Sequence, residues 1–322
     1  MSDGKNILSA DIGGTHSRFA HFTTGPAGDL RLVGVKWLKT TEAGSFGGLL
    51  EKLREGGSSL RPEEADMVII AIAGPIEGGV KSFPPFISWG IDLSNAREEH
   101  GFRKSALIND FVAQAYACHT PVGEAAEGIL PGEAVPGAPI GAIGAGTGLG
   151  QAVLIHDGKG GYIALPSEGG HANFPFVSPQ ECQFQEFLLR ERGDKYITGN
   201  IVVSGKGLSY IHQFLNGERL KPEDVAERIV EHPETLGWMS RFYGRACRNF
   251  VLETLALGGL YIAGGVAARI PELVTGKDFE LEFRSSDTLA HLLNKVPVFL
   301  VNDENSGLWG GAFFGRQLLT NG

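Results

Sequence analysis

Apolar and polar positions alternate in short segments through the first part of the chain. Residues 6–10 alternate weakly, and residues 18–22 and 33–38 are two further short runs that could form strands, separated by glycine-containing stretches. This pattern predicts three strands of an antiparallel meander. Residues 67–73 form a nearly continuous β-branched and apolar run. Such a run predicts a strand that is buried on both faces.

Further along the chain, strand-like runs and helical spacings are interspersed. Strands are expected at 140–143, 152–156, 162–165, 260–263 and 296–301, and helices at 46–54, 180–192, 222–231, 236–257 and 308–319. Residues 83–89 predict an ordered loop, and residues 123–139, rich in Gly, Pro and Glu, a surface connection. Clustered strands between helices indicate an α/β protein with two related halves.

One segment combines a strand end with chemically useful side chains. Residues 106–108 are the apolar end of a strand, Asn109 and Asp110 follow, and residues 111–118 have helical spacing. Ligands of α/β sheets bind at the carboxyl ends of strands, where a carboxamide beside a carboxylate can hold a polyol and remove a proton. The alternative is that Asp110 only caps the helix behind it.

Composition narrows the class of protein. The 322 residues suggest about two domains, and 42% hydrophobic content is enough for a large core. A net charge of −9 argues against nucleic acid and anionic membranes as main partners. Three cysteines, Cys118, Cys182 and Cys247, form no CxxC pair, which is typical of a reducing cytoplasm. Neither a signal peptide nor a membrane span is expected.

Glycine-rich turns follow three of the expected strands. They comprise Asp11, Ile12, Gly13, Gly14 and Thr15; then Gly144 to Gly148, with Gly146, Thr147 and Gly148 at the centre; and Gly264 with Gly265. Glycines let backbone amides approach an anion closely, so three such turns indicate a nucleotide site. Asp11 could orient a hydrated Mg²⁺ between phosphates. The spacing fits neither a dinucleotide fingerprint nor a P-loop.

A second polar cluster contains Glu168 and His171. Their separation suits a metal pair on a helix, but Gly169 and Gly170 between them disfavour a helix. Contacts to sugar hydroxyls, or simply a surface loop, are the remaining interpretations.

Taken together, these motifs resemble the bacterial glucokinases of the actin-like ATPase superfamily. The matching pieces run in family order at residues 11–15, 108–111, 144–150, 168–171, 203–208, 261–265 and 307–311. The resemblance implies a two-domain actin-like ATPase (ribonuclease H-like) fold with a ligand cleft between the domains. The expected small domain spans 1–109 plus 304–322, and the large domain spans 110–303. The family is commonly dimeric, so a homodimer is expected.

The resemblance also implies roles for individual residues. Asp110 would be the catalytic base, and Asn109, Glu168, His171 and Asn200 would bind glucose. Ala10 to Thr15 and Gly146 to Gly148 would bracket the phosphates of ATP, with Mg²⁺ at Asp11, and Gly264 and Gly265 would lie near the adenosine.

Three positions depart from the family pattern. His16 stands where an Asn is usual, Asn200 where a sugar-binding Glu is usual, and residues 83–89 lack an Asn before the Trp-containing loop. The expected reaction is phosphorylation of D-glucose at O6 by ATP. The alternatives are another hexose, another phosphoryl donor, or a sugar sensor that does not catalyse.

Overall fold

The computed structural model describes residues 4–84 and 86–320, which fall into two compact units. The first unit comprises 1–125 and 303–322, and the second 126–302. Residues 1–3 and 321–322 of the expected small domain, and Pro85 of the expected loop, lie outside the described residues. The expected boundary after residue 109 falls sixteen residues earlier than this division, because the helix that starts at Asp110 packs within the first unit.

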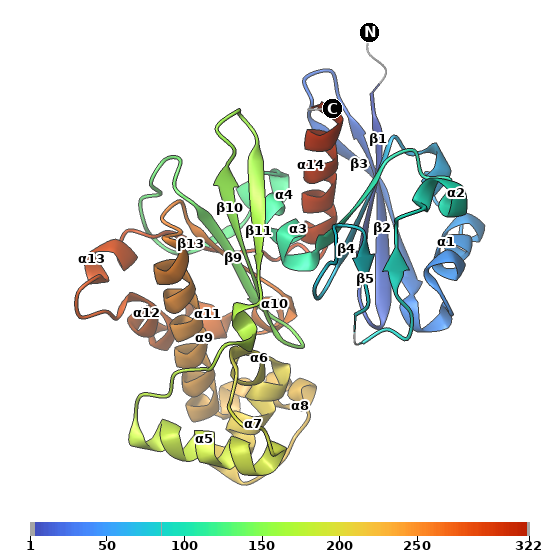
Figure 1. The fold of residues 1–322 in the computed structure, drawn as a ribbon. Coiled ribbons are helices and arrows are strands. Elements are labelled where there is room, and N and C mark those ends of the chain that lie inside the picture. The colour runs from blue at the N-terminus through green and yellow to red at the C-terminus, as the bar shows by residue number, and fades with distance from the viewer. Residues whose placement is uncertain (1–3, 85, 321–322) are drawn as a thin grey trace. The chain divides into compact units, whose positions relative to one another are not determined.

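The first unit is built on a five-stranded sheet in the order β3-β2-β1-β4-β7 (Figure 1). Its strands are β1 (Asn6–Ile12), β2 (His16–Thr24), β3 (Leu30–Lys39), β4 (Met67–Ile72) and β7 (Ser105–Asn109). The first three form the predicted antiparallel meander, and β4 and β7 join parallel to β1. All six β4 residues are buried, as the apolar run predicted.

Helices cover this sheet on both faces. Leu8, Ala10 and Ile12 of β1 face the core beneath α1 (Phe46–Glu55). The other face carries α14 (Ser306–Thr320), which also packs against α3 (Asp110–Ala117). Glycines permit this close packing, because a methyl group at Gly310 would overlap the carbonyl oxygen of Ala113. The remaining elements of this unit are β5 (Lys81–Ser82), β6 (Ile91–Asp92), α2 (Ala96–His100), α4 (Pro121–Glu124) and two 3₁₀ turns, Thr40–Glu42 and Pro62–Glu64.

The second unit repeats the same sheet arrangement. Its six strands lie in the order β11-β10-β9-β12-β13-β8. They are β8 (Glu127–Leu130), β9 (Ile140–Ala145), β10 (Leu149–His156), β11 (Tyr162–Ser167), β12 (Leu260–Ala263) and β13 (Val298–Leu300). The meander β9-β10-β11 is antiparallel, and β12 and β13 continue parallel to β9, as β4 and β7 continue from β1. The expectation of two related α/β halves is therefore confirmed.

Helices of the second unit enclose a large aromatic core. The 22-residue helix α9 (Pro233–Thr254) contributes Trp238, Phe242, Tyr243 and Phe250 to it. The other helices are α5 (Pro179–Arg192), α6 (Gly199–Val202), α7 (Gly205–Asn216), α8 (Pro222–Glu227), α10 (Gly265–Arg269), α11 (Glu272–Thr275), α12 (Lys277–Arg284) and α13 (Ala290–Leu293). No helix within the described part of the chain is both long and apolar enough to cross a bilayer.

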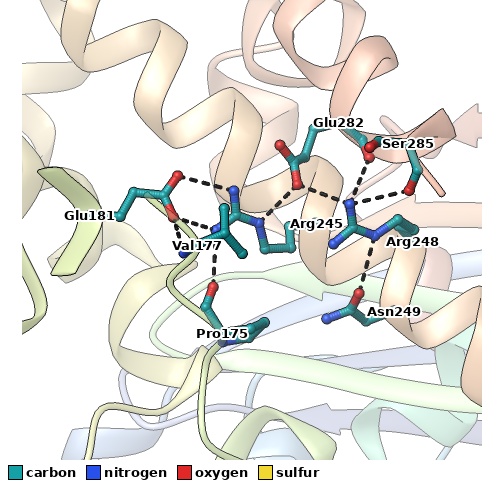
Figure 2. Close-up of polar contacts among 8 residues, drawn as sticks. All are labelled: Pro175, Val177, Glu181, Arg245, Arg248, Asn249, Glu282 and Ser285. Carbon is teal, nitrogen blue, oxygen red and sulfur yellow. Dashed lines mark hydrogen bonds and ion pairs between the residues drawn. The ribbon is translucent and has the colours of Figure 1, made fainter. Parts of the chain in front are cut away.

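A buried ionic network ties three of these helices together (Figure 2). Arg245 of α9, 1% exposed, donates to both carboxylate oxygens of Glu181 on α5, at 2.6 and 3.0 Å. Its Nε donates to Glu282 of α12 at 2.8 Å, and Glu282 also accepts from Arg248 at 3.0 Å. Every charge in the network has an opposite partner, as buried charges require.

Several element boundaries differ from those expected. The first strand continues through Asp11 and Ile12, because both pair with β2 and β4, so the turn itself is only residues 13–15. The expected surface connection 123–139 contains β8, which gains its hydrogen bonds from the distant β13. The expected helix 222–231 ends at Glu227 and continues as a 3₁₀ turn over Ile229–Glu231.

Candidate active site

The turn between β1 and β2 brings backbone amides and one carboxylate to the carboxyl end of β1. The Gly13 amide donates to the His16 carbonyl at 3.0 Å, and the Thr15 carbonyl accepts from the Thr40 amide at 2.9 Å. A Cβ at Gly14 would lie 3.2 Å from the Phe86 ring, so the backbone passes close to that loop. Ala10 and Ile12 are buried at 0% and 1% exposure, so their side chains belong to the core.

Asp11 is the charged group of this turn region. Its Oδ2 lies 3.9 Å from Nη1 of Arg18, the residue opposite it on β2, and its side chain is 28% exposed. Burial raises the pKa of Asp11, and the charge of Arg18 opposes this without reversing it. Arg18 is itself engaged by the Trp37 ring, at 4.3 Å from the centroid, and by the Glu304 carbonyl. Arg18 therefore neutralises the charge of an ionised Asp11 only in part.

Asn109 and Asp110 lie at the same edge of the same sheet. Asn109 pairs with Ile72 of β4, and Ile72 pairs with Ile12 of β1, so the carboxyl ends of β1, β4 and β7 coincide. Asn109 caps α3: its Oδ1 accepts from the amides of Phe111 and Val112 at 2.8 and 3.3 Å. Its Nδ2 donates to the Gly74 carbonyl at 3.3 Å.

Asp110 is the first residue of α3, not its cap. Its Oδ1 accepts from the Phe111 amide at 2.9 Å. The alternative interpretation, in which Asp110 serves as the helix cap, is wrong, because Asn109 fills that position. Asp110 is thus held at the N-terminus of α3, at the strand edge that also carries Asp11.

The second unit has an equivalent turn at the end of β9. The Gly146 amide donates to the Gly148 carbonyl at 2.8 Å, and the Gly146 carbonyl accepts from the Gly205 amide at 3.0 Å. A Cβ added at Gly146 would meet nothing within 4 Å, whereas one at Gly148 would lie 3.0 Å from Oδ1 of Asn200. Gly146 therefore borders open space, and Gly148 is packed.

The turn with Gly264 and Gly265 lies beside it. β12 runs parallel to β9 with Ala263 opposite Gly144. Gly264 has φ of 98°, which favours glycine, and a Cβ there would lie 2.7 Å from the Ala145 carbonyl oxygen. The two glycine turns of this unit are therefore adjacent at one sheet edge.

Glu168, His171 and Asn200 surround the start of β10. Nε2 of His171 lies 3.6 Å from Oε2 of Glu168 across a 3₁₀ turn, and both side chains are more than half exposed, at 70% and 58%. Oδ1 of Asn200 accepts from the Leu149 amide at 2.7 Å. A Cβ at Gly170 would lie 2.5 Å from the same oxygen, so Asn200 also packs on the Glu168–His171 loop.

A pocket of about 480 Å³ opens beside these residues. Thr147, His171 and Asn200 line it, together with Lys206 of the 203–208 motif and with residues that the sequence patterns did not single out: Arg192, Asp194, Lys195, Tyr196, Thr198, Ile201 and Tyr210. Only the short segment around Lys206, within the 203–208 motif, carried a signal that could have pointed to it.

The structure therefore gathers the candidate residues in two sets. Asp11, Asn109 and Asp110 share a sheet edge with the turn 13–15 in the first unit. The turns at Gly146 and Gly264, and the cluster of Glu168, His171 and Asn200, belong to the second unit.

Comparisons with known proteins agree with this arrangement. A family model described as glucokinase matches residues 8–318. The glucokinase of Nostoc punctiforme is 30% identical over 97% of this chain and 99% of its own length. That of Pectobacterium atrosepticum is 30% identical over 97% and 98%.

Among solved structures, a glucokinase from an Antarctic psychrotroph superposes with a TM-score of 0.83. It is 26% identical, with 97% of this chain and 99% of that chain covered. The expected two-domain actin-like ATPase fold is thereby confirmed. Given the family model that spans nearly the whole chain and the curated relatives that match it end to end, the chain belongs to the glucokinase family.

Proposed function

We propose that this protein transfers the γ-phosphoryl group of ATP to the 6-hydroxyl of D-glucose, giving glucose 6-phosphate and ADP. The observation that carries the proposal is the sheet edge of the first unit. There Asp110 stands at the N-terminus of α3, in register with the glycine turn that follows Asp11. Membership of the glucokinase family supports the same reaction.

In this proposal Asp110 is the general base. Its carboxylate accepts the proton of the 6-hydroxyl while that oxygen forms a bond to the γ-phosphorus and the bond from phosphorus to the ADP oxygen breaks. Asn109 binds a sugar hydroxyl through the second hydrogen of Nδ2, since its Oδ1 already accepts two backbone amides. Glu168 and His171 offer a carboxylate and an imidazole to other hydroxyls of the sugar.

The glycine turns are proposed as the ATP contacts. Amides of Gly14 and Thr15 in one unit, and of Thr147 and Gly148 in the other, donate to phosphate oxygens, while the amides of Gly13 and Gly146 hold the two turns in shape. Gly264 and Gly265 are proposed to lie near the adenosine. The open space beside Gly146 is consistent with such a role.

Mg²⁺ is proposed to accompany ATP, with Asp11 as its protein partner. The described residues contain no cluster of three or more His, Cys, Asp or Glu side chains suited to a metal ion. A single incompletely neutralised carboxylate nevertheless fits Mg²⁺, which usually binds through one or two carboxylates plus substrate phosphates and waters. Bound there, the cation would neutralise charge on the phosphates. Asp11 would orient its hydration shell.

Three further parts of the proposal concern the whole protein. We propose a cytoplasmic location, which the unpaired cysteines support. We propose a homodimer, which light scattering coupled to size-exclusion chromatography tests. We also propose that the two compact units are the two domains of the family fold, with residues 110–125 in the first.

The experiment that tests the activity is a coupled ADP-release assay with purified protein, Mg·ATP and a panel of hexoses. Glucose should give the highest kcat/KM, and EDTA should abolish turnover. Replacement of ATP by GTP or polyphosphate tests the donor. ADP release no faster with any hexose than without sugar would refute the proposed kinase activity.

A further inference from the structure

One buried polar side chain of α3 has no part in the reaction described so far. Gln114 lies four residues after Asp110, so the two side chains share one face of the helix, one turn apart. The Oε1 atom of Gln114 is shielded from solvent and accepts no hydrogen bond from any residue in the ranges 4–84 and 86–320. A buried acceptor without a partner lowers stability, so its presence here indicates a partner that comes from outside the chain.

The carboxamide of Gln114 lies close to Asp11, beside the start of α14. The helix α14 packs against α3 in the first unit (Figure 1), and Gly307 is its second residue. A Cβ at Gly307 would lie 3.4 Å from Nε2 of Gln114 and 3.6 Å from Oδ2 of Asp11. These two atoms are therefore at most 3.4 + 3.6 = 7.0 Å apart. Gly307 thus borders the space between the carboxamide and the carboxylate.

The size of this space suits bridging water. A hydrogen bond spans about 2.8 Å, so one or two water molecules connect groups at such a separation. The carboxylate of Asp11 only accepts hydrogen bonds. The Oε1 of Gln114 also accepts, and a half-turn of the terminal torsion brings it to either side of the carboxamide.

The chemistry of the space favours water that is bound to a cation. Two acceptors need a species that donates in both directions, and a metal-bound water does so, because the metal holds its oxygen. Arg18 comes no closer to the carboxylate of Asp11 than 3.9 Å, so negative charge remains there to attract a cation.

We propose that Gln114 is a positioning residue for the Mg²⁺ that accompanies ATP. Its Oε1 accepts a hydrogen bond from a water of the hydration shell that Asp11 also orients. The helix α3 thereby links this hydration shell to Asp110, one turn away on the same face. The inference rests on the proposed function, because Asp11 is the proposed partner of Mg²⁺, and it adds a residue outside every motif that carries the family resemblance.

Two variants and one control test this role. Gln114→Met keeps the length of the side chain but removes the carboxamide. Gly307→Ala leaves every polar group in place and adds a methyl group to the space, in ordinary contact with Gln114 and Asp11. The matched control is Gln213→Met in the second unit, where Oε1 is likewise buried and lacks a partner within the described part of the chain.

Calorimetric titration without glucose compares the affinity of each protein for Mg·ATP with its affinity for ATP in EDTA. Wild type and control should prefer Mg·ATP. In both test variants this preference should shrink, and half-maximal activity should need about 10–100-fold more Mg²⁺, as for other residues that orient the ligands of a metal. The melting temperature of both ligand-free variants should stay the same or rise, because one loses an unpaired acceptor and the other a helical glycine.

A wild-type preference for Mg·ATP that persists in Gln114→Met would overturn the inference, and so would equal affinity of the wild type for both forms of ATP. A lower melting temperature with an unchanged preference would assign Gln114 a structural role instead. These titrations need no turnover, so their outcome is separate from that of the kinase assay. Turnover by the wild type together with no effect of Gln114→Met would contradict the role of Gln114 and leave the kinase activity standing.

Discussion

The side-chain oxygen of Asn200 accepts a hydrogen bond from the backbone amide of Leu149 at 2.7 Å. That bond joins the start of α6 to the residue directly after the turn 146–148. The same oxygen packs against Gly148 and Gly170, so one side chain contacts both the proposed phosphate turn and the loop that carries His171. Asn200 therefore fills a positioning role, in addition to any contact that its nitrogen makes with a sugar.

This role predicts that Asn200→Ala will lower both the stability and the activity of the protein. Loss of the acceptor leaves the Leu149 amide without its partner, which costs about 1–3 kcal/mol when such a group is buried. We expect kcat/KM to fall and the KM values for both ATP and glucose to rise, because both loops lose their common contact. Steady-state kinetics with each substrate varied in turn measures this.

Asn200→Asp is the matched control, since it keeps an oxygen at the same position and should retain most of the ATP affinity. If Asn200→Ala changes only the KM for glucose, Asn200 is a sugar ligand and its link to the turn is unimportant.

Gly146 and Gly148 should respond differently to substitution. Gly146→Ala places a methyl group in open space, so the fold should be unaffected, but that space is where we propose the phosphates lie. We expect an increase in KM for ATP without a change in thermal stability. Gly148→Ala forces Asn200 to move and should lower stability as well.

Calorimetry and ATP-dependent kinetics on both variants check this pair. Unchanged kinetics for Gly146→Ala would argue that no phosphate approaches this turn.

We expect Asp11 to lower the stability of the ligand-free protein while supporting its activity. Burial raises its pKa above 3.8, the usual value, against the opposing charge of Arg18. A raised folded-state pKa means that the stability contributed by the protonated form is present below the unfolded pKa and is lost as pH rises through the folded pKa. At any pH above its folded-state pKa, the ionised Asp11 therefore lowers the free energy of unfolding.

Asp11→Asn should accordingly raise the melting temperature of the ligand-free protein at pH 7. At pH 4 the rise in melting temperature should be smaller. Activity should fall about 10–100-fold, the loss typical of residues that orient a metal's ligands. Thermal scans and Mg²⁺ titrations of activity measure the two effects. A melting temperature that falls together with activity would indicate a structural role for Asp11.

The buried pair of Arg245 and Glu181 should govern acid stability. Burial acts to raise the pKa of Glu181, but hydrogen bonds from Arg245 and from the Val177 amide outweigh it and lower the pKa overall. A lowered folded-state pKa means that the stabilisation is present above the unfolded value, near 4.5, and is lost as pH falls through the folded value.

Glu181→Gln should therefore lower the free energy of unfolding at pH 7 by about 3 kcal/mol, because it leaves part of the Arg245 charge uncompensated. Glu42→Gln, which breaks the exposed pair with Lys39, should cost much less, because solvent screens that pair. Denaturant titrations at pH 7 and below pH 4 measure this. A Glu181→Gln deficit that does not shrink in acid would contradict the pH account.

Local pattern was sufficient for much of the fold. Strands form at both the short run 18–22 and the apolar run 67–73, as predicted, and residues 19–22 and 67–72 are buried. The β8 strand could not be predicted, because residues 127–130 include no clear alternation and gain their hydrogen bonds from β13, far along the chain.

In the candidate site, too, local features could be predicted from the sequence, but contacts between distant segments could not. Glycine turns after strands are visible in the sequence, as is the pair Asn109 and Asp110. Either Asn109 or Asp110 can adopt the backbone angles of a helix N-cap, so the sequence did not show which residue caps α3. In the structure the N-cap is Asn109. The cations of the pocket come from α5, the connection after it and α7, and no local spacing relates them.

If Asp110 removes the proton of the sugar hydroxyl, the kcat of Asp110→Asn must fall steeply. Asn keeps the Oδ1 that accepts from the Phe111 amide, so the helix start should be preserved, but it cannot take up a proton. Asp92→Asn, an exposed acid of the same unit, is the control. With saturating glucose and Mg·ATP, we expect the kcat of Asp110→Asn to fall about 10²–10⁴-fold, with glucose affinity and melting temperature nearly unchanged. A kcat close to that of the wild type would contradict it.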